Sequence, residues 1–583
     1  MANITVTING VQVEVPENST ILEAAHIAHI DIPTLCYMKE INEIGACRIC
    51  VVEVKGAKGL VTACVYPVSP GMEIYTNSKK VREARKKTVE LMLSNHNRSC
   101  LSCVRSGNCE LMQLSREYGV EDPGYYDGEK TEAKIDDSCV HMIRDNSKCI
   151  LCRRCVAVCS SNQAVSVIGP NERGFKTYIG TAFDIPLSET SCVNCGQCIA
   201  VCPTGALRER DFTEEVFAAI QDPTKHVVVQ TAPAVRASLG ESFGMPIGTN
   251  VEGKMVAALR RLGFDKVFDT NYSADLTIVE EANELVERIQ NGGKLPMITS
   301  CSPGWVKFCE HYFPDMIDNL SSCKSPQQMF GAVCKSYYAK KNNIDPRDIV
   351  MVSVMPCTAK KFEIGRPDQD ANGVPDVDYA LTTRELARMI KTAGIRFESL
   401  PDEGYDDPLG ESTGAGVIFG ATGGVMEAAL RTAVETITGE KLENVDFKEV
   451  RGVQAVKEAT YEVGGLKLNV AVVSGLKNAQ ALLEKVRNGE ADYQFIEVMA
   501  CPGGCVNGGG QTQVPYGIRN FVDIRAERAK ALYAIDEAKT IRKSHDNPFI
   551  KALYEEYLEK PGSHEAHHLL HTTYVKREIN KKF

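Results

Sequence analysis

Cysteine supplies most of the side chains in this chain whose type and spacing could do chemistry. The 583 residues include 23 cysteines but only 11 histidines. Ligand sets dominated by sulfur favour iron–sulfur clusters or zinc. The chain begins MANITVTINGVQVEV, with neither a signal peptide nor a twin-arginine leader. Grouped cysteines in such a long chain are more typical of metal sites than of disulfides, so we expect several metal centres.

Two segments repeat the spacing C-x2-C-x2-C-x3-C, the ligand pattern of a two-cluster ferredoxin. In that pattern three cysteines of one run bind one cubane, and the fourth reaches the other cubane. Cys202 is followed by Pro203, as in bacterial ferredoxins, whereas Cys159 is followed by Ser160. Zinc knuckles are the alternative, but the identical spacing favours two [4Fe–4S] clusters, with the ligands Cys149, Cys152, Cys155, Cys159, Cys192, Cys195, Cys198 and Cys202.

Two further groups lie nearer the N-terminus. The spacing C-x10-C-x2-C-x13-C fits a [2Fe–2S] site, although its first gap is longer than in plant-type ferredoxins; a four-cysteine zinc site is the alternative. The spacing H-x3-C-x2-C-x5-C has the composition of a structural zinc site, but beside three other clusters a histidine-ligated [4Fe–4S] cluster is favoured. The expected ligands are Cys36, Cys47, Cys50 and Cys64 in the first group, and His96, Cys100, Cys103 and Cys109 in the second.

The C-terminal half carries a different cysteine pattern. MPCTAKK (355–361) and EVMACPGGCVNGGG (497–510) place cysteines among glycines and methionines. Glycine lets the backbone approach a bulky inorganic group, and methionine provides a soft apolar wall. Cys357, Cys501 and Cys505 are one ligand short of a cubane, which directs attention to the stretch TSCSPGW (299–305).

The elements that must position these residues can be read from hydrophobic periodicity. Alternating apolar residues on both sides of Asn9-Gly10 predict a β-hairpin, and Thr20-Ile-Leu-Glu23 predicts a helix with a capping box. In the second half, strand-like runs at 226–232 and 349–357 alternate with helical stretches such as 280–293. This alternation predicts mixed or parallel sheets covered by helices.

Charge and hydropathy exclude some classes of partner. The net charge of −10 argues against a nucleic-acid partner, which would favour a basic face. No apolar run approaches the roughly 20 residues that a membrane span needs, so we expect no membrane partner. We expect a cytoplasmic protein.

Together these motifs resemble the catalytic subunits of [FeFe]-hydrogenases over essentially the whole chain. The family has the signatures TSCCPxW, MPCxxKxxE and ExMACxxGCxxGG, which are TSCSPGW, MPCTAKKFE and EVMACPGGCVNGG here. The first departs at one residue, in a form similar to multisubunit members linked to pyridine nucleotides. The resemblance implies a multidomain fold of α+β and α/β parts: a β-grasp [2Fe–2S] ferredoxin-like domain (1–79), a His/Cys3 [4Fe–4S] domain (80–137), a two-[4Fe–4S] ferredoxin domain (138–210), an α/β H-cluster domain (211–523) and a C-terminal helical wrapping segment (524–583).

The resemblance also implies an H-cluster, which is a [4Fe–4S] cubane joined through a cysteine sulfur to a two-iron subsite carrying CO, cyanide and a dithiolate amine. By position, Cys357, Cys501 and Cys505 would bind the cubane, with Cys505 as the bridge. Lys360 would hydrogen-bond a cyanide as a cation holding an anionic ligand. Maturation proteins would supply the two-iron unit, and its walls would be Ala232, Pro233, Gln327, Met355 and Met499.

The stretch TSCSPGW aligns Cys301 with the family's proton shuttle and Ser302 with a cubane ligand. Three alternatives remain open: Ser302 binds iron through oxygen, Cys301 shifts to become the ligand, or another thiol such as Cys323 fills the position. The resemblance implies a proton route that continues through Glu281, Glu284, Ser321 and Arg288, although such helical charges otherwise form a solvated face. Outside any motif, we expect inert buried thiols at Cys139, Cys309 and Cys334.

The expected function is therefore reversible H2 oxidation and proton reduction. Two alternatives are a non-catalytic H2 sensor or cluster-assembly protein, and an electron-transfer subunit, since the N-terminal part also resembles the large iron–sulfur subunit of respiratory NADH dehydrogenases. No G-x-G-x-x-G follows a predicted strand, so a flavin- and NAD(P)-binding partner subunit would hold the nicotinamide. Ferredoxin is the alternative electron partner.

Overall fold

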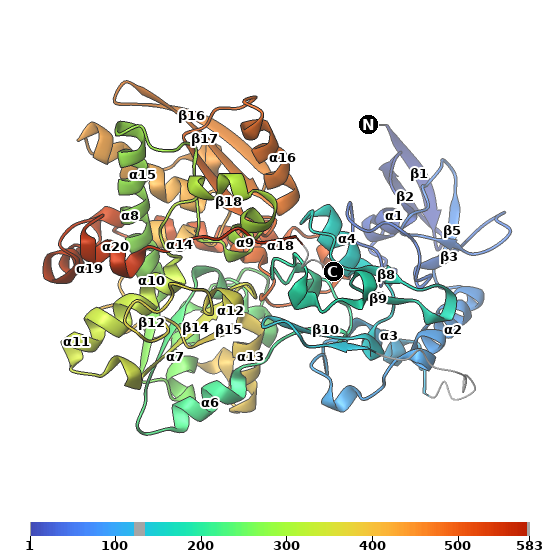
Figure 1. The fold of residues 1–583 in the computed structure, drawn as a ribbon. Helices are drawn as coiled ribbons and strands as arrows, with labels where there is room; N and C mark the ends of the chain where they lie inside the picture. The colour runs from blue at the N-terminus through green and yellow to red at the C-terminus, as the bar shows by residue number, and fades with distance from the viewer. Residues whose placement is uncertain (1, 122–133, 580–583) are drawn as a thin grey trace.

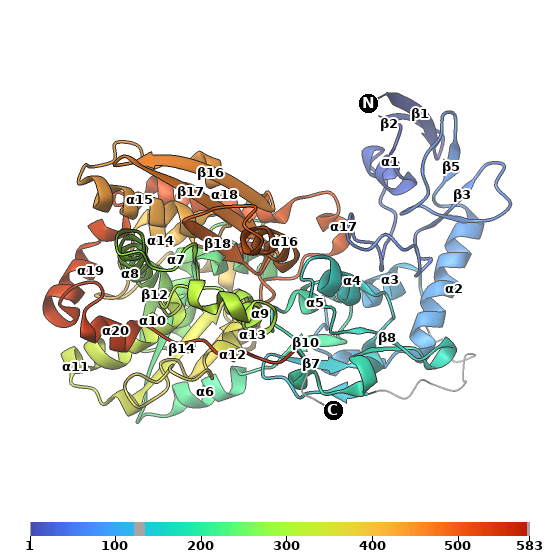
Figure 2. The same cartoon turned by 45° about the horizontal axis from the view of Figure 1, so that its top comes forward.

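The computed structural model describes residues 2–121 and 134–579. Figures 1 and 2 show small N-terminal units packed beside a larger C-terminal part of helices and sheets. Residues 122–133, which belong to the predicted 80–137 domain, lie outside the described residues.

The N-terminal unit is a five-stranded sheet with one short helix. The predicted hairpin is confirmed, because Asn9 (φ 49°) and Gly10 (φ 86°) turn β1 into β2 with positive φ at both turn positions. The predicted capping box at Thr20 and Glu23 is also present and opens α1. The strands run in the order β2-β1-β5-β3-β4, with bounds β1 Asn3–Ile8, β2 Val11–Pro16, β3 Val51–Val54, β4 Val61–Thr62 and β5 Glu73–Tyr75, and α1 is Ile21–Ile27.

The next two units are short helices and strands around cysteine loops. The charged segment after Ser78 forms a single helix, α2, and the internal cysteine repeat forms two matching short helices, α4 and α5. A small sheet of order β10-β7-β6 supports the repeat. The bounds are α2 Lys79–Asn95, α3 Glu110–Glu117, β6 Ile135–Asp136, β7 Met142–Asp145, α4 Arg154–Ser161, β8 Gly169–Asn171, β9 Tyr178–Gly180, α5 Gln197–Ala200 and β10 Leu207–Glu209.

The larger part contains two four-stranded sheets. One sheet, of order β12-β11-β14-β15, is parallel throughout. The other, of order β13-β18-β17-β16, is parallel except at the β16–β17 hairpin. The bounds are β11 His226–Thr231, β12 Lys266–Asp269, β13 Met297–Ile298, β14 Ile349–Met355, β15 Tyr379–Thr382, β16 Val456–Val463, β17 Leu466–Ser474 and β18 Phe495–Met499.

The helices cover both sheets, as the alternating sequence pattern predicts. The longest, α8, begins at Thr270, ten residues before the predicted start at 280, with Asp269 as its N-cap. Apolar periodicity does not predict its first half, because polar residues such as Asn271 and Asp275 are fully buried there, at positions where the pattern would need apolar residues. The bounds are α6 Thr213–Gln221, α7 Glu252–Leu262, α8 Thr270–Gln290, α9 Pro303–Tyr312, α10 Pro326–Val333, α11 Ala339–Asn342, α12 Lys360–Glu363, α13 Thr383–Thr392, α14 Gly414–Ile418, α15 Gly424–Thr438 and α16 Leu476–Arg487.

The fold places the conspicuous sequence motifs at one set of strand ends. The loops that follow β11, β13, β14 and β18 carry, in that order, residues 232–233, 299–302, 356–361 and 500–505. In open α/β sheets, ligand sites form outside the carboxyl ends of parallel strands. Motifs that are far apart in sequence are therefore brought to one place.

The C-terminal segment is helical, as predicted, and is tied to the sheets by buried charge. The helices are α17 Tyr516–Arg519, α18 Ile524–Ala538, α19 Pro548–Leu553 and α20 His564–Leu570. Asp536 on α18 accepts two hydrogen bonds from Arg431 on α15, at 2.9 and 2.8 Å, and both side chains are fully buried. Within residues 2–121 and 134–579, no helix is both long and apolar enough to cross a bilayer.

Replacing Asp536 with alanine is expected to destabilise the protein by about 3–5 kcal/mol, because Arg431 then loses a fully buried partner. Thermal unfolding and amide exchange in α18 measure the effect. The matched control is Lys530→Ala on the same helix, whose ion pair with Glu527 is exposed and contributes about 1 kcal/mol or less. Equal unfolding temperatures for the two variants would contradict this prediction.

Candidate functional site

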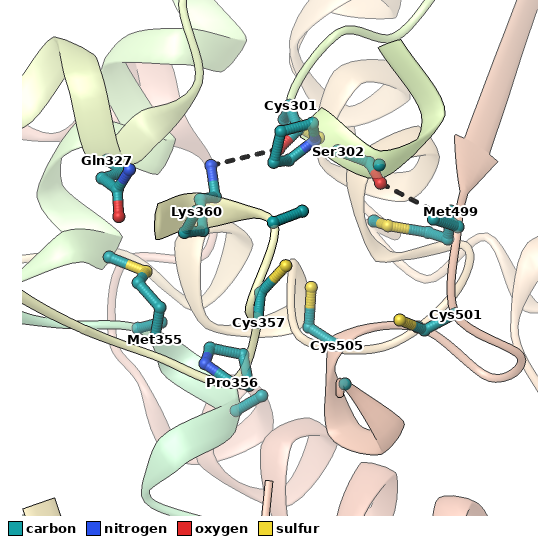
Figure 3. A pocket seen from close by; sticks show the side chains of 18 of the residues that line it. Cys301, Ser302, Gln327, Met355, Pro356, Cys357, Lys360, Met499, Cys501 and Cys505 are labelled. Carbon is teal, nitrogen blue, oxygen red and sulfur yellow. Dashed lines mark hydrogen bonds between the residues drawn. The ribbon is translucent and has the colours of Figure 1, made fainter. Parts of the chain in front are cut away.

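A mostly apolar cavity lies where the four motif-bearing loops meet, and its empty space, open solvent included, is about 800 Å³. Figure 3 shows side chains from all three signature stretches around it. The residues expected to wall the cofactor, Ala232, Pro233, Gln327, Met355 and Met499, all line this cavity. Six cysteine and serine residues also line it: Cys195, Cys301, Ser302, Cys357, Cys501 and Cys505.

Three thiols point into the cavity from two loops, as Figure 3 shows for Cys357, Cys501 and Cys505. Burial, followed by the nearby Cys357, raises the pKa of Cys505 to about 12, and burial likewise raises the pKa values of the other two thiols. Thiolates here therefore need a strong cationic partner, which the iron of a cluster provides. The two loops that carry these thiols approach each other closely, since a Cβ added to Gly508 would lie 2.0 Å from the Pro356 carbonyl oxygen. The donor set, the apolar wall and the free volume fit a cubane with an attached subsite.

The stretch TSCSPGW is held rigidly at the edge of this cavity. The Trp305 indole is fully buried and donates a hydrogen bond of 3.0 Å to the Thr299 carbonyl, which closes the loop on itself. Lys360 Nζ donates a 3.3 Å hydrogen bond to the Cys301 carbonyl. Burial, followed by the charge of Glu281, raises the pKa of the Cys301 thiol. The Cys301 thiol therefore keeps its proton at neutral pH.

A buried polar network behind Cys301 includes one residue not singled out from sequence, Glu363. This carboxylate accepts hydrogen bonds from Lys360 (2.8 Å), Gln327 (3.0 Å) and Ser325 (2.8 Å). Lys360 and Glu363 stand three apart on α12, so they share one helix face. That spacing within MPCTAKKFE is the signal that could have identified Glu363 as the anchor of Lys360.

The four residues of the expected proton route lie on α8 and on the loop after α9. Glu284 accepts hydrogen bonds from Arg288 (2.6 Å) and Ser321 (2.8 Å), so these three form one connected group. Glu281 is fully buried, and neither of its carboxyl oxygens has a hydrogen-bond partner among the described residues. Burial, together with the charge of Glu284, raises the pKa of Glu281 to about 8. Glu281 can therefore exchange protons near neutral pH.

Cys323 was one of the alternatives to Ser302 as the fourth ligand. Cys323 packs in the core with its sulfur 3.8 Å from the Glu284 carboxylate, and it is not among the residues that line the cavity. A cluster in the cavity is therefore out of reach of Cys323. The other unassigned thiols, Cys139, Cys309 and Cys334, are buried, and burial raises the pKa of each, which agrees with inert core cysteines.

The cysteine repeat forms two cavities, whose empty space, open solvent included, is about 440 and 500 Å³. The fourth cysteine of each run crosses to the other run, as the ferredoxin pattern predicts. Four cysteines line each cavity, which matches the four cysteine ligands of a [4Fe–4S] cluster. The linings contain Cys149, Cys152, Cys155 and Cys202 in one case, and Cys159, Cys192, Cys195 and Cys198 in the other.

The four cysteines expected to bind the [2Fe–2S] cluster lie in two close pairs. The Cys50 and Cys64 sulfurs are 3.2 Å apart, and the Cys36 and Cys47 thiols hydrogen-bond each other, which lowers the pKa of Cys47 to about 6. Burial, followed by the charge of Lys148, lowers the pKa of His96 to about 4, so its ring is neutral and able to bind metal.

The His96 Nδ1 atom is buried and has no hydrogen-bond partner in the part of the chain that the structure describes. An unpartnered ring nitrogen is what a metal ligand presents before its metal binds. Cys103 of the same group lies against the backbone that follows Cys202, where a Cβ on Gly205 would be 2.5 Å from its sulfur. This group therefore adjoins the two-cluster unit.

The two-cluster unit in turn adjoins the main cavity. Cys195 lines both its own cluster cavity and the large one. The backbones meet closely here, since a Cβ on Gly509 would lie 2.2 Å from the Cys195 carbonyl oxygen. Gln197 also donates a 2.9 Å hydrogen bond to the Asn507 carbonyl. The cysteine groups thus form a continuous series that leads to the large cavity.

Family models match this layout along the chain. The iron-only hydrogenase large subunit, C-terminal domain, matches residues 225–509, and the iron hydrogenase small subunit matches 522–577. The N-terminal half matches a 2Fe-2S iron-sulfur cluster binding domain (1–79), the NADH-ubiquinone oxidoreductase-G iron-sulfur binding region (85–123) and a 4Fe-4S dicluster domain (148–206).

Individual relatives agree over almost the full length. The NADP-reducing hydrogenase subunit HndD of Solidesulfovibrio fructosivorans is 51% identical over 99% of this chain and 100% of its own. Iron hydrogenase 1 of Clostridium pasteurianum is 47% identical over 98% and 100%. An apo [FeFe]-hydrogenase HydA1 structure from Chlamydomonas reinhardtii superimposes with a TM-score of 0.57 and 43% identity, covering 63% of this chain and 100% of that one. The chain therefore belongs to the [FeFe]-hydrogenase family, with 2Fe–2S and 4Fe–4S domains ahead of its H-cluster domain.

Proposed function

We propose that this hydrogenase interconverts H2 with protons and electrons in the large cavity, and that one [2Fe–2S] and three [4Fe–4S] clusters carry the electrons between that cavity and a partner. The observation that carries the proposal is the meeting of three thiols, Cys301 and Lys360 around one cavity that shares Cys195 with the next cluster site. An electron-transfer subunit alone would not need the catalytic cavity.

The residues that would hold the H-cluster are those whose side chains converge. Cys357, Cys501 and Cys505 would bind the cubane, and Cys505 would bridge to the two-iron subsite. Once bound, the H-cluster supplies the iron chemistry that splits or forms H2. Lys360 would donate a hydrogen bond to an anionic ligand of the subsite, with Glu363 holding its ammonium group in place. The apolar wall, including Met355 and Met499, excludes water.

The proposed proton route follows the order in which titratable side chains lie between the cavity and the surface. Cys301 lines the cavity, and the charge of Glu281 lies close enough to raise the pKa of its thiol. Glu281 is followed on α8 by Glu284, which is joined to Ser321 and Arg288. Arg288 is partly exposed, so this series gives a proton a way from the cavity to solvent. We assign Cys301 as the donor nearest the reacting atoms and the remaining groups as relays.

The partner is proposed to be a subunit that binds flavin and NADP. Two observations support it: a relative that is 51% identical is named as a subunit of an NADP-reducing hydrogenase, and the [2Fe–2S] domain lies at the opposite end of the cluster series from the cavity. Ferredoxin is the alternative partner.

The first experiment is maturation of the whole chain with the two-iron cofactor under anaerobic conditions. We expect infrared bands from CO and cyanide that shift when H2 is added, and H2-dependent dye reduction. Addition of the NADP-linked partner or of ferredoxin then identifies the acceptor. Fully iron-loaded protein without such bands and without turnover would refute the proposed function.

Replacing Glu281 with glutamine is expected to lower turnover by about 100-fold or more, because an amide cannot pass on the proton. The infrared bands should remain, since Glu281 does not line the cavity. The matched control is Glu287→Gln, an exposed carboxylate on the same helix, for which turnover should be unchanged. Wild-type turnover in E281Q would remove Glu281 from the route.

The raised pKa of Glu281 also predicts a pH dependence of stability. The folded protein holds this proton up to about pH 8, whereas the unfolded chain releases it near its ordinary value of 4.5. Between these values the unfolded state binds fewer protons, so the stability of the wild type falls as pH rises, relative to E281Q. Urea denaturation of the apoprotein at several pH values measures this. If the difference in unfolding free energy between the wild type and E281Q did not change between pH 5 and pH 8, the raised pKa of Glu281 would be contradicted.

Replacing Glu363 with glutamine is expected to lower turnover by about 10- to 100-fold, because the anchor of Lys360 and Gln327 loses its charge. H2 uptake after full maturation measures the effect, and the cyanide bands should shift because Lys360 is no longer fixed. The exposed carboxylate of Glu398 offers the control, as Glu398→Gln should leave both readouts unchanged.

A further inference from the structure

We infer that the fourth ligand of the active-site cubane is the side-chain oxygen of Ser302, bound as an alkoxide. The inference rests on the proposed function, because it concerns the cluster held by Cys357, Cys501 and Cys505. A cubane with three cysteine ligands needs one further donor. Five cysteines line the large cavity, and two of them are engaged elsewhere.

Cys195 and Cys301 are the two that are engaged elsewhere. Cys195 lines the neighbouring cluster cavity together with the other thiols of its own run. The carbonyl of Cys301 accepts a 3.3 Å hydrogen bond from Lys360, which holds this residue in place. Turning Cys301 toward the cubane would require the loop to move, yet Trp305 and its hydrogen bond to Thr299 fix that loop.

Ser302 has a conformation that leaves its hydroxyl available to the cavity. It is the N-cap of α9, and its carbonyl accepts hydrogen bonds from Trp305 N and Val306 N, both at 3.0 Å. A serine at this position ordinarily also caps the helix through its side chain. Here the side chain makes no capping hydrogen bond, and the residue lines the cavity instead. Figure 3 shows Ser302 across the cavity from the three thiols.

The surroundings of Ser302 stabilise negative charge on its oxygen. The backbone N–H of Ala500, directly before the ligand Cys501, donates a hydrogen bond of 3.3 Å to Ser302 Oγ. The ten-residue helix α9 begins at the next residue, so Ser302 lies at its positive end. Binding forms one Fe–O bond and releases the hydroxyl proton to the medium, and no electron is transferred. Since oxygen is a harder donor than sulfur, it favours the more oxidised cluster.

The test compares iron content and EPR spectra of the full chain loaded with its iron–sulfur clusters but not with the two-iron subsite. Turnover is not needed, so failure here is distinguishable from failure of the proposed function. In Ser302→Ala we expect loss of one iron per chain and an oxidised three-iron EPR signal that the wild type lacks. In Ser302→Cys the iron content should stay complete, and the midpoint potential of one [4Fe–4S] cluster should rise.

Two variants of the same loop complete the experiment. Ser300→Ala is the matched control, because the Ser300 hydroxyl donates to the Cys323 carbonyl and does not line the cavity, and its iron content should equal that of the wild type. Cys301→Ala should likewise keep all its iron. The inference is overturned if Ser302→Ala keeps the wild-type iron content and spectrum, or if Cys301→Ala is the variant that loses iron.

Discussion

The whole arrangement depends on one geometric constraint: parallel strands of two sheets must end at the same cavity. The cysteines proposed to bind one cluster follow β14 and β18, which belong to different sheets. Neither sheet alone could surround an inorganic group. The buried helices, the rigid TSCSPGW loop and the C-terminal segment all keep those strand ends in register around the cavity.

Burial around the site changes the pKa values of its titratable residues. Burial disfavours charge, and it raises the pKa values of the thiols in the cavity and of Glu281 behind it. Lys360 Nζ donates hydrogen bonds to Glu363 and to two further oxygens, which fix its position. The raised pKa of Glu281 is the property that the proposed proton route requires.

Local signals in the sequence were sufficient for the hairpin and the capping box, because each depends on residues a few positions apart. The cluster spacing even predicted the crossing of the fourth cysteines. Contacts made through tertiary packing were not predictable: the first half of α8 is buried although it is polar, and Glu363 has a role only because Gln327 and Ser325 meet it from another helix and loop. Likewise, only the folded loop shows that Cys323 faces Glu284 rather than the cavity.

Helix α18 supports the loop that carries Cys505. Arg528 on that helix donates a 2.7 Å hydrogen bond to the Val506 carbonyl, one residue after Cys505, and pairs with Glu241 from the first part of the catalytic fold. The loop is therefore braced by a helix that is itself anchored to a residue 287 positions earlier in the chain.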